Sequence, residues 1–399
     1  MTHPLLIIGA GLAGWQTVRE FRKLDADTPI TLVTADAGDF YAKPTLSNAF
    51  GQKRGPAQLV TTPAATIAQT LNVTLLSHTR VTAIDSVAKT VQTSAGVLAY
   101  RDLVLATGAQ PIRVPLAGDA AEQALSVNSL DDFGVFHQRL TALGEGAPNV
   151  RIAIMGAGLI GCEFANDLAG AGYAVTVIDP ADRPLAALLP PTASVQLQEA
   201  LAGLSVHWHL GATVQAVNRQ ADALVLTLSN GQTLVADILL SAIGLRADTS
   251  LAQAAGIACE RGIVVDRQLQ TSAPHVWALG DSAQYASAAS PGAPTGRTLP
   301  YVMPIMAAAK VLAASLHGTP ASLEFAAMPV AIKTPALPIV AHPPAPGQLG
   351  QWVEQVLGEW WFASEDLPER AHGFVLTGPH TSKRMALVKQ MTAVATTTT

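Results

Sequence analysis

The sequence predicts an α/β protein with two Rossmann-like domains and a small α+β C-terminal domain. The glycine pattern GxGxxG occurs at residues 9–14 and again at 156–161, and each copy follows an apolar run typical of a buried strand. Beyond about residue 320, short strand-like runs alternate with proline-rich loops. A chain of 399 residues is long enough for two or three such domains.

Composition and charge exclude several classes of protein. Apolar residues make up 49% of the chain and charged residues 13%, so nearly all of it should fold. The net charge of -5 and the scattered basic residues argue against a nucleic-acid partner. The apolar opening at 5–8 lacks the basic flank of a signal peptide, and no apolar run is long enough to span a membrane.

The number and spacing of the cysteines indicate the cellular compartment and exclude one type of redox chemistry. The only cysteines are Cys162 and Cys259, and they form neither a CxxC nor a CxxxxC pair. Such sparse usage is typical of a reducing cytoplasm, where we expect this protein. It also removes the redox-active dithiol that a disulfide reductase needs.

The first βαβ unit is predicted from a strand at 5–8, a helix through about residue 23 and a strand at 30–34. The first glycine of the turn allows a tight bend, the second lets the backbone approach a pyrophosphate, and the third allows close packing of helix on strand. Asp36 follows Gly14 by 22 residues, near the interval of about 20 expected for a carboxylate that binds ribose hydroxyls.

A second βαβ unit repeats the pattern, with strands at 151–155 and 174–178. Asp179 follows Gly161 by 18 residues. A carboxylate there accepts hydrogen bonds from a free 2′-hydroxyl and repels a 2′-phosphate, so the second site should prefer NADH to NADPH.

Later segments supply further elements. Asn230 and Gly231 predict a two-residue type I′ hairpin turn. The segment TSAPHVWALGD ends in Asp281 at the carboxyl end of a predicted strand, where a carboxylate can hold the ribityl chain of a flavin. A loop at 286–300, rich in small residues and proline, is expected to be flexible, and 301–316 is expected to be helical.

The combination of the first GxGxxG, the ATG at 106–108, the second GxGxxGxEF and the late strand ending in GD resembles the FAD-dependent pyridine nucleotide reductases of the glutathione reductase superfamily. The resemblance implies that FAD is the cofactor and NADH the substrate, with the NAD domain inserted in the FAD domain. It implies a discontinuous FAD-binding domain at 1–110 and 243–319, an NADH-binding domain at 111–242 and a C-terminal domain at 320–399.

The resemblance can be narrowed by the loop after the first βαβ unit. Most disulfide reductases carry a cysteine pair there, whereas this chain has YAKPTLSNAF. YAKPTLS, GAGLIGCEFANDL, LPYVMPIM and VAIKTPALPIV are very similar to the bacterial NADH:rubredoxin reductases. That family passes electrons to rubredoxin, a small acidic iron protein, in alkane hydroxylation or oxidative-stress defence.

Three other functions remain open on the sequence alone. A ferredoxin reductase that feeds an oxygenase would share every FAD and NAD motif. An NADH oxidase or peroxidase is disfavoured because the cysteine after the first unit is missing. The third is a flavin-binding redox-signalling protein.

Glu163 and Lys333 are the predicted catalytic residues. Glu163 could simply be a carboxylate that the helix dipole favours. The resemblance implies instead a place at the junction of nicotinamide and flavin, the GxGxxGxE position of the family, and the apolar neighbours Cys162 and Phe164 favour this interpretation. Lys333 could be an exposed strand lysine, but a lone cation in PVAIKTPALPIV matches the VxVKTP of the family. Beside a flavin, its charge would stabilise the anionic reduced ring.

Together, the glycine turns and the resemblance predict the cofactor-binding residues. They are Gly9, Ala10, Gly11, Leu12, Gly14, Thr34, Ala35, Asp36, Lys43, Val81, Thr107, Gly108, Gly156, Gly158, Gly161, Glu163, Asp179, Gly280, Asp281, Val302 and Lys333.

Three further sets of residues have simpler interpretations. Cys162 is expected to be a buried packing residue, not a nucleophile. His207 and His209 share one strand face without further ligands in view, so no metal site is predicted. A basic rim would steer an acidic partner, and its candidates, each of which could also be an ordinary solvated charge, are Lys53, Arg54, Arg297, Lys383 and Arg384.

Overall fold

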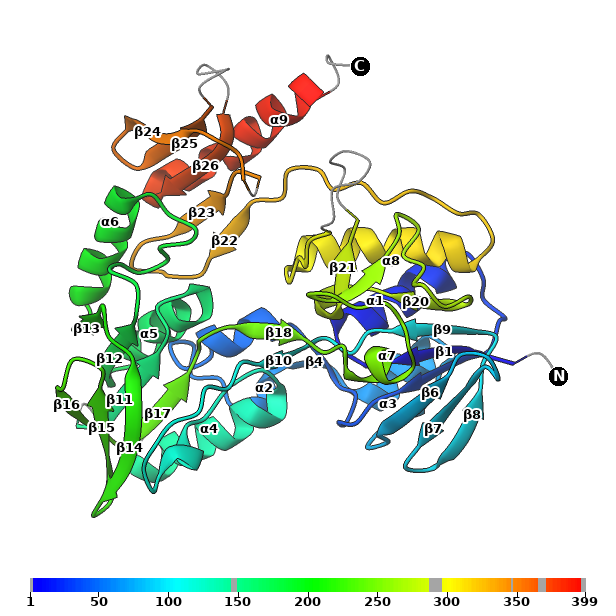
Figure 1. Cartoon of the computed structure of the whole chain (residues 1–399), viewed down its shortest axis with the longest axis horizontal. Helices are drawn as coiled ribbons and strands as arrows, with labels where there is room; N and C mark the ends of the chain where they lie inside the picture. The colour runs from blue at the N-terminus through cyan, green and yellow to red at the C-terminus, as the bar shows by residue number, and fades with distance from the viewer. Residues whose placement is uncertain (1–2, 145–148, 287–295, 346, 365–370, 396–399) are drawn as a thin grey trace. The chain divides into compact units, whose positions relative to one another are not determined.

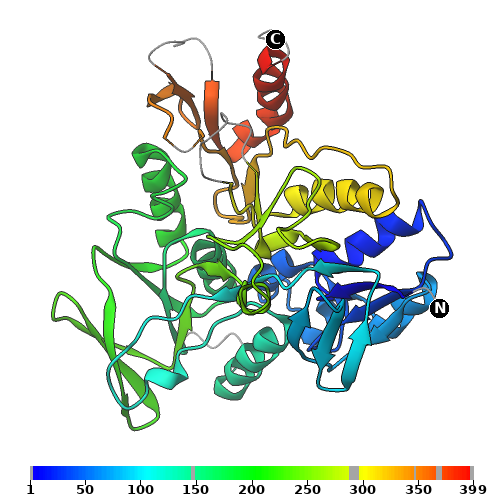
Figure 2. The same cartoon turned by 45° about the vertical axis from the view of Figure 1, so that its right-hand side comes forward.

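The computed structural model describes residues 3–144, 149–286, 296–345, 347–364 and 371–395. The chain divides into two compact units, shown in Figures 1 and 2. The first comprises Met1–Lys43, Val60–Gln110 and Leu245–Phe325, and the second comprises Pro44–Leu59, Pro111–Gly244 and Ala326–Thr399. Most of the loop predicted to be flexible at 286–300 lies outside the described residues.

The first unit is built on a parallel five-stranded sheet in the order β20-β9-β1-β2-β5. Its central strand β1 is a continuous apolar run with all four side chains buried, as expected for a strand covered on both faces. Helices α1 and α8 pack against each other beside this sheet (Figure 1). The bounds are β1 (Leu5–Ile8), β2 (Ile30–Val33), β5 (Thr74–Leu76), β9 (Asp102–Leu105), β20 (Val276–Ala278), α1 (Leu12–Arg22) and α8 (Val302–Leu316).

Shorter elements complete the first unit. The strands β6, β7 and β8 form an antiparallel sheet, and β19 pairs with β21. Their bounds are β6 (Val81–Asp85), β7 (Thr90–Thr93), β8 (Gly96–Ala99), β19 (Ile263–Val265) and β21 (Ala283–Tyr285). The remaining short elements are β3 (Phe40–Tyr41), β4 (Val60–Thr62), α3 (Ala64–Thr70), β10 (Ala109–Pro111), β18 (Leu245–Ala247), α7 (Ser250–Ala254) and η3 (Gly280–Ser282).

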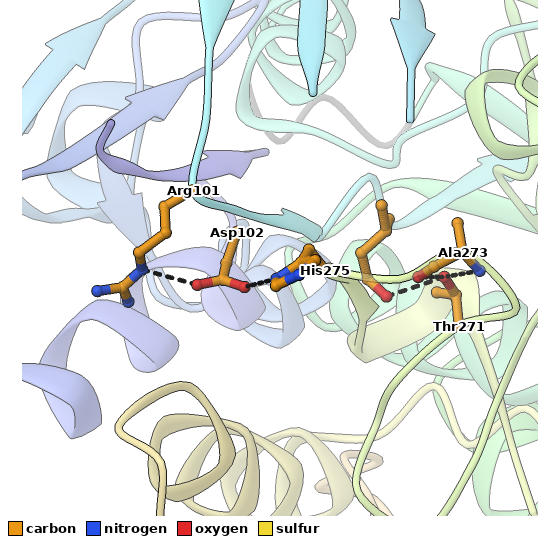
Figure 3. Close-up of polar contacts among 6 residues, drawn as sticks. Arg101, Asp102, Thr271, Ala273 and His275 are labelled. Carbon is orange, nitrogen blue, oxygen red and sulfur yellow. Dashed lines mark hydrogen bonds and ion pairs between the residues drawn. The ribbon is translucent and has the colours of Figure 1, made fainter. Parts of the chain in front are cut away.

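Polar contacts fix the point where β9 and β20 begin (Figure 3). The Asp102 carboxylate accepts a hydrogen bond from Arg101 Nε at 2.7 Å, and its other oxygen lies 3.0 Å from His275 Nδ1. Thr271 and Ala273 close the turn before β20, where the Ala273 amide donates to the Thr271 hydroxyl at 3.2 Å. These contacts set the start of the strand that leads to Asp281.

The second unit contains a parallel sheet in the order β13-β12-β11-β17. Helix α5 follows β11 directly and packs on β11 and β12. The bounds are β11 (Arg151–Met155), β12 (Ala174–Asp179), β13 (His207–Leu210), β17 (Ile238–Ser241), α2 (Pro56–Leu59), α4 (Leu130–Leu143), α5 (Leu159–Gly170), α6 (Pro191–Ala202), η1 (Lys43–Asn48) and η2 (Ala121–Gln123).

An antiparallel sheet of β14 (Val214–Gln220), β15 (Ala223–Leu228) and β16 (Thr233–Ala236) accompanies it. The predicted hairpin is present between β15 and β16, but the predicted type I′ turn is wrong. Gly231 has a φ of +83°, whereas Asn230 is not among the described residues with positive φ, and a type I′ turn needs both. The connection is longer than two residues, so only its glycine has to adopt the left-handed conformation.

The C-terminal part of the second unit is an antiparallel sheet in the order β22-β23-β26-β25-β24, and α9 packs on β26. Its small core contains Val340, Phe374, Leu376 and Leu387. The bounds are β22 (Val330–Ile332), β23 (Ile339–His342), β24 (Gln351–Val356), β25 (Glu359–Ala363), β26 (Ala371–Thr377), η4 (Gly378–Lys383) and α9 (Arg384–Ala395).

Two parallel sheets with glycine turns and a small α+β C-terminal part confirm the predicted fold class. The domain boundaries near 110, 243 and 320, and their assignment to FAD and NADH, stay predictions. Within the residues that the structure describes, the helices are too short or too polar to cross a membrane.

Candidate active site

The first glycine turn joins β1 to α1, and its three glycines are needed for different reasons. Gly9 has a φ of +110°, and a Cβ there would lie 2.2 Å from the Ala106 carbonyl oxygen. A Cβ on Gly14 would lie 1.9 Å from the Gly9 oxygen, whereas one on Gly11 would have no atom within 4 Å. Packing therefore requires the first and third glycines, and the second leaves space in front of the helix N-terminus for an anionic ligand.

The second turn joins β11 to α5 with the same geometry. A Cβ on Gly156 would lie 2.5 Å from the Ala242 oxygen, and one on Gly161 would lie 1.9 Å from the Gly156 oxygen. Gly158 again has open space around the missing side chain. Two separate sites of the chain are thus shaped to accept a pyrophosphate.

The acidic residue predicted for each site is held by hydrogen bonds from nearby residues. Asp179 accepts hydrogen bonds from the backbone N–H groups of Ala157 at 2.6 Å and Ala181 at 2.7 Å. Asp36 accepts one bond from the Thr34 hydroxyl at 2.6 Å and one from the Gly38 N–H at 2.9 Å, both on Oδ1. Each carboxylate is therefore held at the end of the second strand of its unit.

Asp281 is a half-buried carboxylate that follows β20, in the short helix η3. Burial raises the pKa of this carboxyl group, and the nearby Lys43 ammonium opposes that shift. Within the described part of the chain, its Oδ1 atom is buried without a hydrogen-bond partner. An unpaired buried carboxylate oxygen is costly, so this atom fits a ligand hydroxyl.

The other residues predicted for the first site share the first unit with Asp281. Thr107 donates its hydroxyl hydrogen to the Asp248 carbonyl at 2.9 Å, and Gly108 has a φ of +73°. Val81 is buried, whereas Val302 is 40% exposed at the start of α8. Their contact with a cofactor stays a prediction.

The second unit brings together Glu163 and Lys333, which are 170 residues apart in the sequence. Glu163 lies on α5 and is 1% exposed. Its Oε1 accepts a hydrogen bond from the Lys333 backbone N–H at 2.9 Å, and its Oε2 forms an ion pair with the Lys333 ammonium. The sequence indicated each residue separately but not their pairing.

Ser47 is a third member of this group, which the sequence reasoning missed. Its hydroxyl donates to Glu163 Oε2 at 2.6 Å, and Ser47 itself is buried. The sequence could have indicated Ser47, because it is the last residue of KPTLS, a segment on which the resemblance was based. Ser47, Glu163 and Lys333 together form the carboxylate cluster.

The carboxylate cluster borders a pocket of about 420 Å³ in the second unit. Lys333 lines this pocket, and its side chain is 36% exposed. The remaining lining residues are Pro44, Thr45, Asn48 and Gln52 from one segment, and Ile332, Thr334, Pro335 and Pro338 from the other. A single cation among neighbours that carry no charge can act strongly on a ligand that binds there.

Two residues outside the predicted site were also missed. Asn166 accepts a hydrogen bond from the Ala336 N–H at 3.0 Å, and Asp167 accepts bonds from the N–H groups of Phe50 and Gly51. Both residues belong to the quoted GAGLIGCEFANDL segment. Nothing in their spacing alone indicated which distant backbone they would meet.

The structure also places the predicted packing cysteine, one of the two paired histidines and one of the predicted basic residues. Cys162 is fully buried, its thiol donates to the Ala157 carbonyl at 3.3 Å, and burial raises the pKa of the thiol, so its role in packing is confirmed. His209 is half-buried, and its Nδ1 lies 3.2 Å from Gln232 Oε1. Among the predicted basic residues, Lys383 forms an ion pair with Glu359 at 2.5 Å.

Two parallel sheets, each with a glycine turn and an acid at the end of its second strand, define an oxidoreductase that uses two dinucleotides. The chain belongs to the pyridine nucleotide-disulphide oxidoreductase family, whose model matches residues 3–305. A second model, described as a rubredoxin binding C-terminal domain, matches residues 322–391.

Individual relatives agree with this assignment. The chain is 42% identical over 396 residues to the rubredoxin-NAD(+) reductase of Alcanivorax borkumensis, covering 98% of this chain and 99% of that one. It is 40% identical to the protein of the same name from Acinetobacter baylyi, covering 97% of each. It is also 42% identical to a nitric oxide reductase FlRd-NAD(+) reductase of Aeromonas salmonicida, covering 85% of this chain and 83% of that one.

The fold matches a solved structure over nearly its whole length. The structure of a covalent putidaredoxin reductase-putidaredoxin complex superposes with a TM-score of 0.85 at 24% identity, covering 97% of this chain and 93% of that one. The resemblance inferred from the sequence motifs is therefore confirmed at the level of the family and of the fold.

Proposed function

We propose that this chain is an FAD-dependent oxidoreductase that takes a hydride from NADH and passes electrons to rubredoxin. The observation that carries the proposal is the rubredoxin-binding match at 322–391, because these residues supply the Lys333 that pairs with Glu163. Glu163 itself lies on the helix that opens at the second glycine turn. The two curated rubredoxin-NAD(+) reductases, similar over almost the full chain, support the same acceptor.

The first unit has features that fit FAD. Its glycine turn leaves space at Gly11, and Asp281 presents a buried oxygen that has no partner in the described chain. We assign the pyrophosphate to the N-terminus of α1 and the ribityl hydroxyls to Asp281, with Asp36 near a ribose. When bound, FAD supplies the chemistry that accepts two electrons together and releases them singly.

The second glycine turn has features that fit NADH. The open space at Gly158 lies at the N-cap of α5, which has no side-chain cap. Asp179 is held by two backbone N–H groups, so its negative charge stays at the end of β12. A fixed carboxylate there favours a ribose with a free 2′-hydroxyl over one with a 2′-phosphate.

The carboxylate cluster supplies the electrostatics of the proposed reaction. Glu163 holds the Lys333 ammonium in one place, and the Ser47 hydroxyl donates to the same carboxylate oxygen. A cation fixed in advance stabilises negative charge that develops on a nearby ring without the cost of reorganising solvent. In this proposal Lys333 stabilises the reduced flavin, and no side chain acts as a covalent nucleophile.

The cytoplasm is the proposed location. The thiols of Cys162 and Cys259 are both free, as in proteins of reducing compartments. NADH is supplied in the same compartment, which fits the proposed substrate.

Anaerobic turnover of the purified yellow protein with NADH tests the proposal. Rubredoxin, a [2Fe-2S] ferredoxin and a disulfide are offered separately at equal concentration, and oxygen consumption is measured in an aerobic sample. We expect rapid reduction of rubredoxin alone. Faster reduction of ferredoxin would favour the reductase of an oxygenase system, and a flavin reduced by NADH without any turnover would favour a signalling protein.

A further inference from the structure

One face of α5 carries three buried polar side chains, at positions 163, 166 and 167. Residues three and four apart lie on the same side of a helix, so Glu163, Asn166 and Asp167 point in a common direction. Their exposed fractions are 1%, 5% and 6%. The proposed function uses only Glu163, and it leaves unexplained why the next turn of the helix buries a second carboxylate.

Asp167 binds the backbone of the segment that carries Ser47. Its Oδ2 accepts a hydrogen bond from the Phe50 N–H and its Oδ1 accepts one from the Gly51 N–H, each at 2.9 Å. The fit is close, because a Cβ added to Gly51 would lie 2.9 Å from Asp167 Oδ1. The carboxylate therefore fixes the backbone three and four residues after Ser47.

The side chain of Phe50 secures the same segment from another direction. Its ring lies 5.4 Å from that of Phe133 and 5.5 Å from that of Phe136, and it stacks on His137 at 5.7 Å. With its side chain in an aromatic cluster and its N–H on Asp167, Phe50 has little freedom to move. The segment that carries Ser47 is thus held in two ways, by backbone hydrogen bonds to Asp167 and by aromatic packing of Phe50. These contacts keep Ser47 beside Glu163.

Asn166 binds the opposite wall of the pocket. Its Oδ1 accepts a hydrogen bond from the Ala336 N–H at 3.0 Å, in the segment 332–338 that contains Lys333. Adjacent residues of one helical turn therefore hold the two segments that line the pocket. Glu163, one turn earlier, joins the same two segments through Ser47 and Lys333.

Burying the Asp167 carboxylate costs desolvation free energy, so we expect its contacts to serve a function. Desolvation raises the pKa of Asp167 to about 6 in spite of the backbone hydrogen bonds that oppose the shift. The nearby Glu163 raises the pKa further. An asparagine would satisfy one N–H at lower cost, but only a carboxylate can accept from two adjacent N–H groups with two equivalent oxygens.

We infer that Asp167 is a positioning residue, which holds Ser47 on Glu163 and so fixes the hydrogen bonding of the Glu163–Lys333 pair during flavin reduction. The inference rests on the proposed function, because it assigns Asp167 an effect on the reaction of NADH with flavin. Asp167 has no hydrogen bond to Glu163 or Lys333 in the described structure. It acts through the backbone of 50–51.

The test is a double-mutant cycle on the FAD-loaded protein with Asp167→Asn, Ser47→Ala and the double variant. Stopped-flow absorbance measures the rate of flavin reduction and the apparent Kd for NADH at several pH values. We expect D167N to lower the limiting rate about tenfold or more, with Kd changed less than about twofold, because the nucleotide turn is untouched. If Asp167 acts through Ser47, the double variant will be no slower than the slower single variant.

Hydrogen exchange gives a readout that is independent of activity. D167N should speed amide exchange in 44–52, where the Phe50 and Gly51 N–H groups lose a carboxylate acceptor, and leave the amides of β11 unchanged. Asp131→Asn is the matched control, since Asp131 is an exposed carboxylate in the first turn of α4, and it should behave like the wild type.

Contrary outcomes separate the two ideas. A wild-type flavin that NADH fails to reduce would refute the proposed function. A wild type that works, with D167N reduced at the same rate or with losses that add in the double variant, would refute the positioning role alone. Faster exchange in D167N with an unchanged rate would likewise leave Asp167 a purely structural residue.

Discussion

The helices that follow the two glycine turns have equivalent beginnings but different side-chain partners. Two residues after its last glycine, α1 has Gln16, whose amide donates to Glu20 on the same helix at 2.8 Å. At the corresponding position α5 has Glu163, which contacts Ser47 and Lys333. The Gln16 side chain thus stays within its own helix, whereas the polar side chains on this face of α5 bind segments more than 100 residues away in the sequence.

The difference continues one turn further along. Glu20 lies six residues after Gly14 and pairs with the exposed Lys23 just past the end of the same helix at 2.7 Å, whereas Asp167 lies six residues after Gly161 and binds the backbone of 50–51. The glycines are thus required by the nucleotide turn, whereas the later residues of the helix can form other contacts. In α5 these contacts position the residues of the carboxylate cluster.

The largest effect is expected at the glycine that both turns share. Gly161→Ala places a Cβ 1.9 Å from the Gly156 oxygen, and Gly14→Ala does the same against Gly9. Each change should lower the free energy of unfolding by about 3 kcal/mol or more. Thermal unfolding and the flavin content after desalting measure the effect, and G14A should lose flavin more severely than G161A.

Gly170→Ala is the matched control for these variants. Gly170 is an exposed glycine on α5 with no atom within 4 Å of an added Cβ. Alanine is the better helix former, so this change should stabilise by about 0.5–1 kcal/mol. A G161A variant as stable as G170A would contradict the close approach of helix and strand at the second turn.

The next effect concerns the first position at which the helices differ. Glu163→Gln puts an amide N–H₂ against a donor and removes the charge that holds Lys333, so flavin reduction by NADH should slow about 10- to 100-fold. Glu20→Gln removes a carboxylate from α1, and its effect on stability should stay within about 0.5 kcal/mol. Stopped-flow kinetics and thermal unfolding of both variants measure these effects; equal rates in E163Q and E20Q would remove Glu163 from the proposed reaction.

The two helices also differ in how far the sequence could predict them. The strands, both turns and the acids Asp36 and Asp179 follow from local patterns, because glycine spacing and buried runs are fixed within some 30 residues. Glu163 and Lys333 stood out as charges among apolar neighbours, but their pairing depends on tertiary contacts. Asp167 belongs to the quoted GAGLIGCEFANDL segment, but its contacts could not be predicted, because a backbone partner 117 residues away leaves no trace in composition or periodicity.

The smallest effect is the pH dependence of stability that Asp167 contributes. The pKa of Asp167 is raised from 3.8 to about 6 in the folded protein, chiefly by burial, so the folded state binds the proton more tightly than the unfolded state. Its contribution to stability is therefore full below pH 3.8 and is lost as the pH rises through about 6. Melting temperatures are measured between pH 5 and pH 7.5. The melting temperature of the wild type should rise relative to that of Asp167→Asn as the pH falls below about 6, and the difference between them should be constant above pH 7. A difference between the two proteins that stays constant from pH 5 to pH 7.5 would show that the buried carboxylate of α5 does not set this slope.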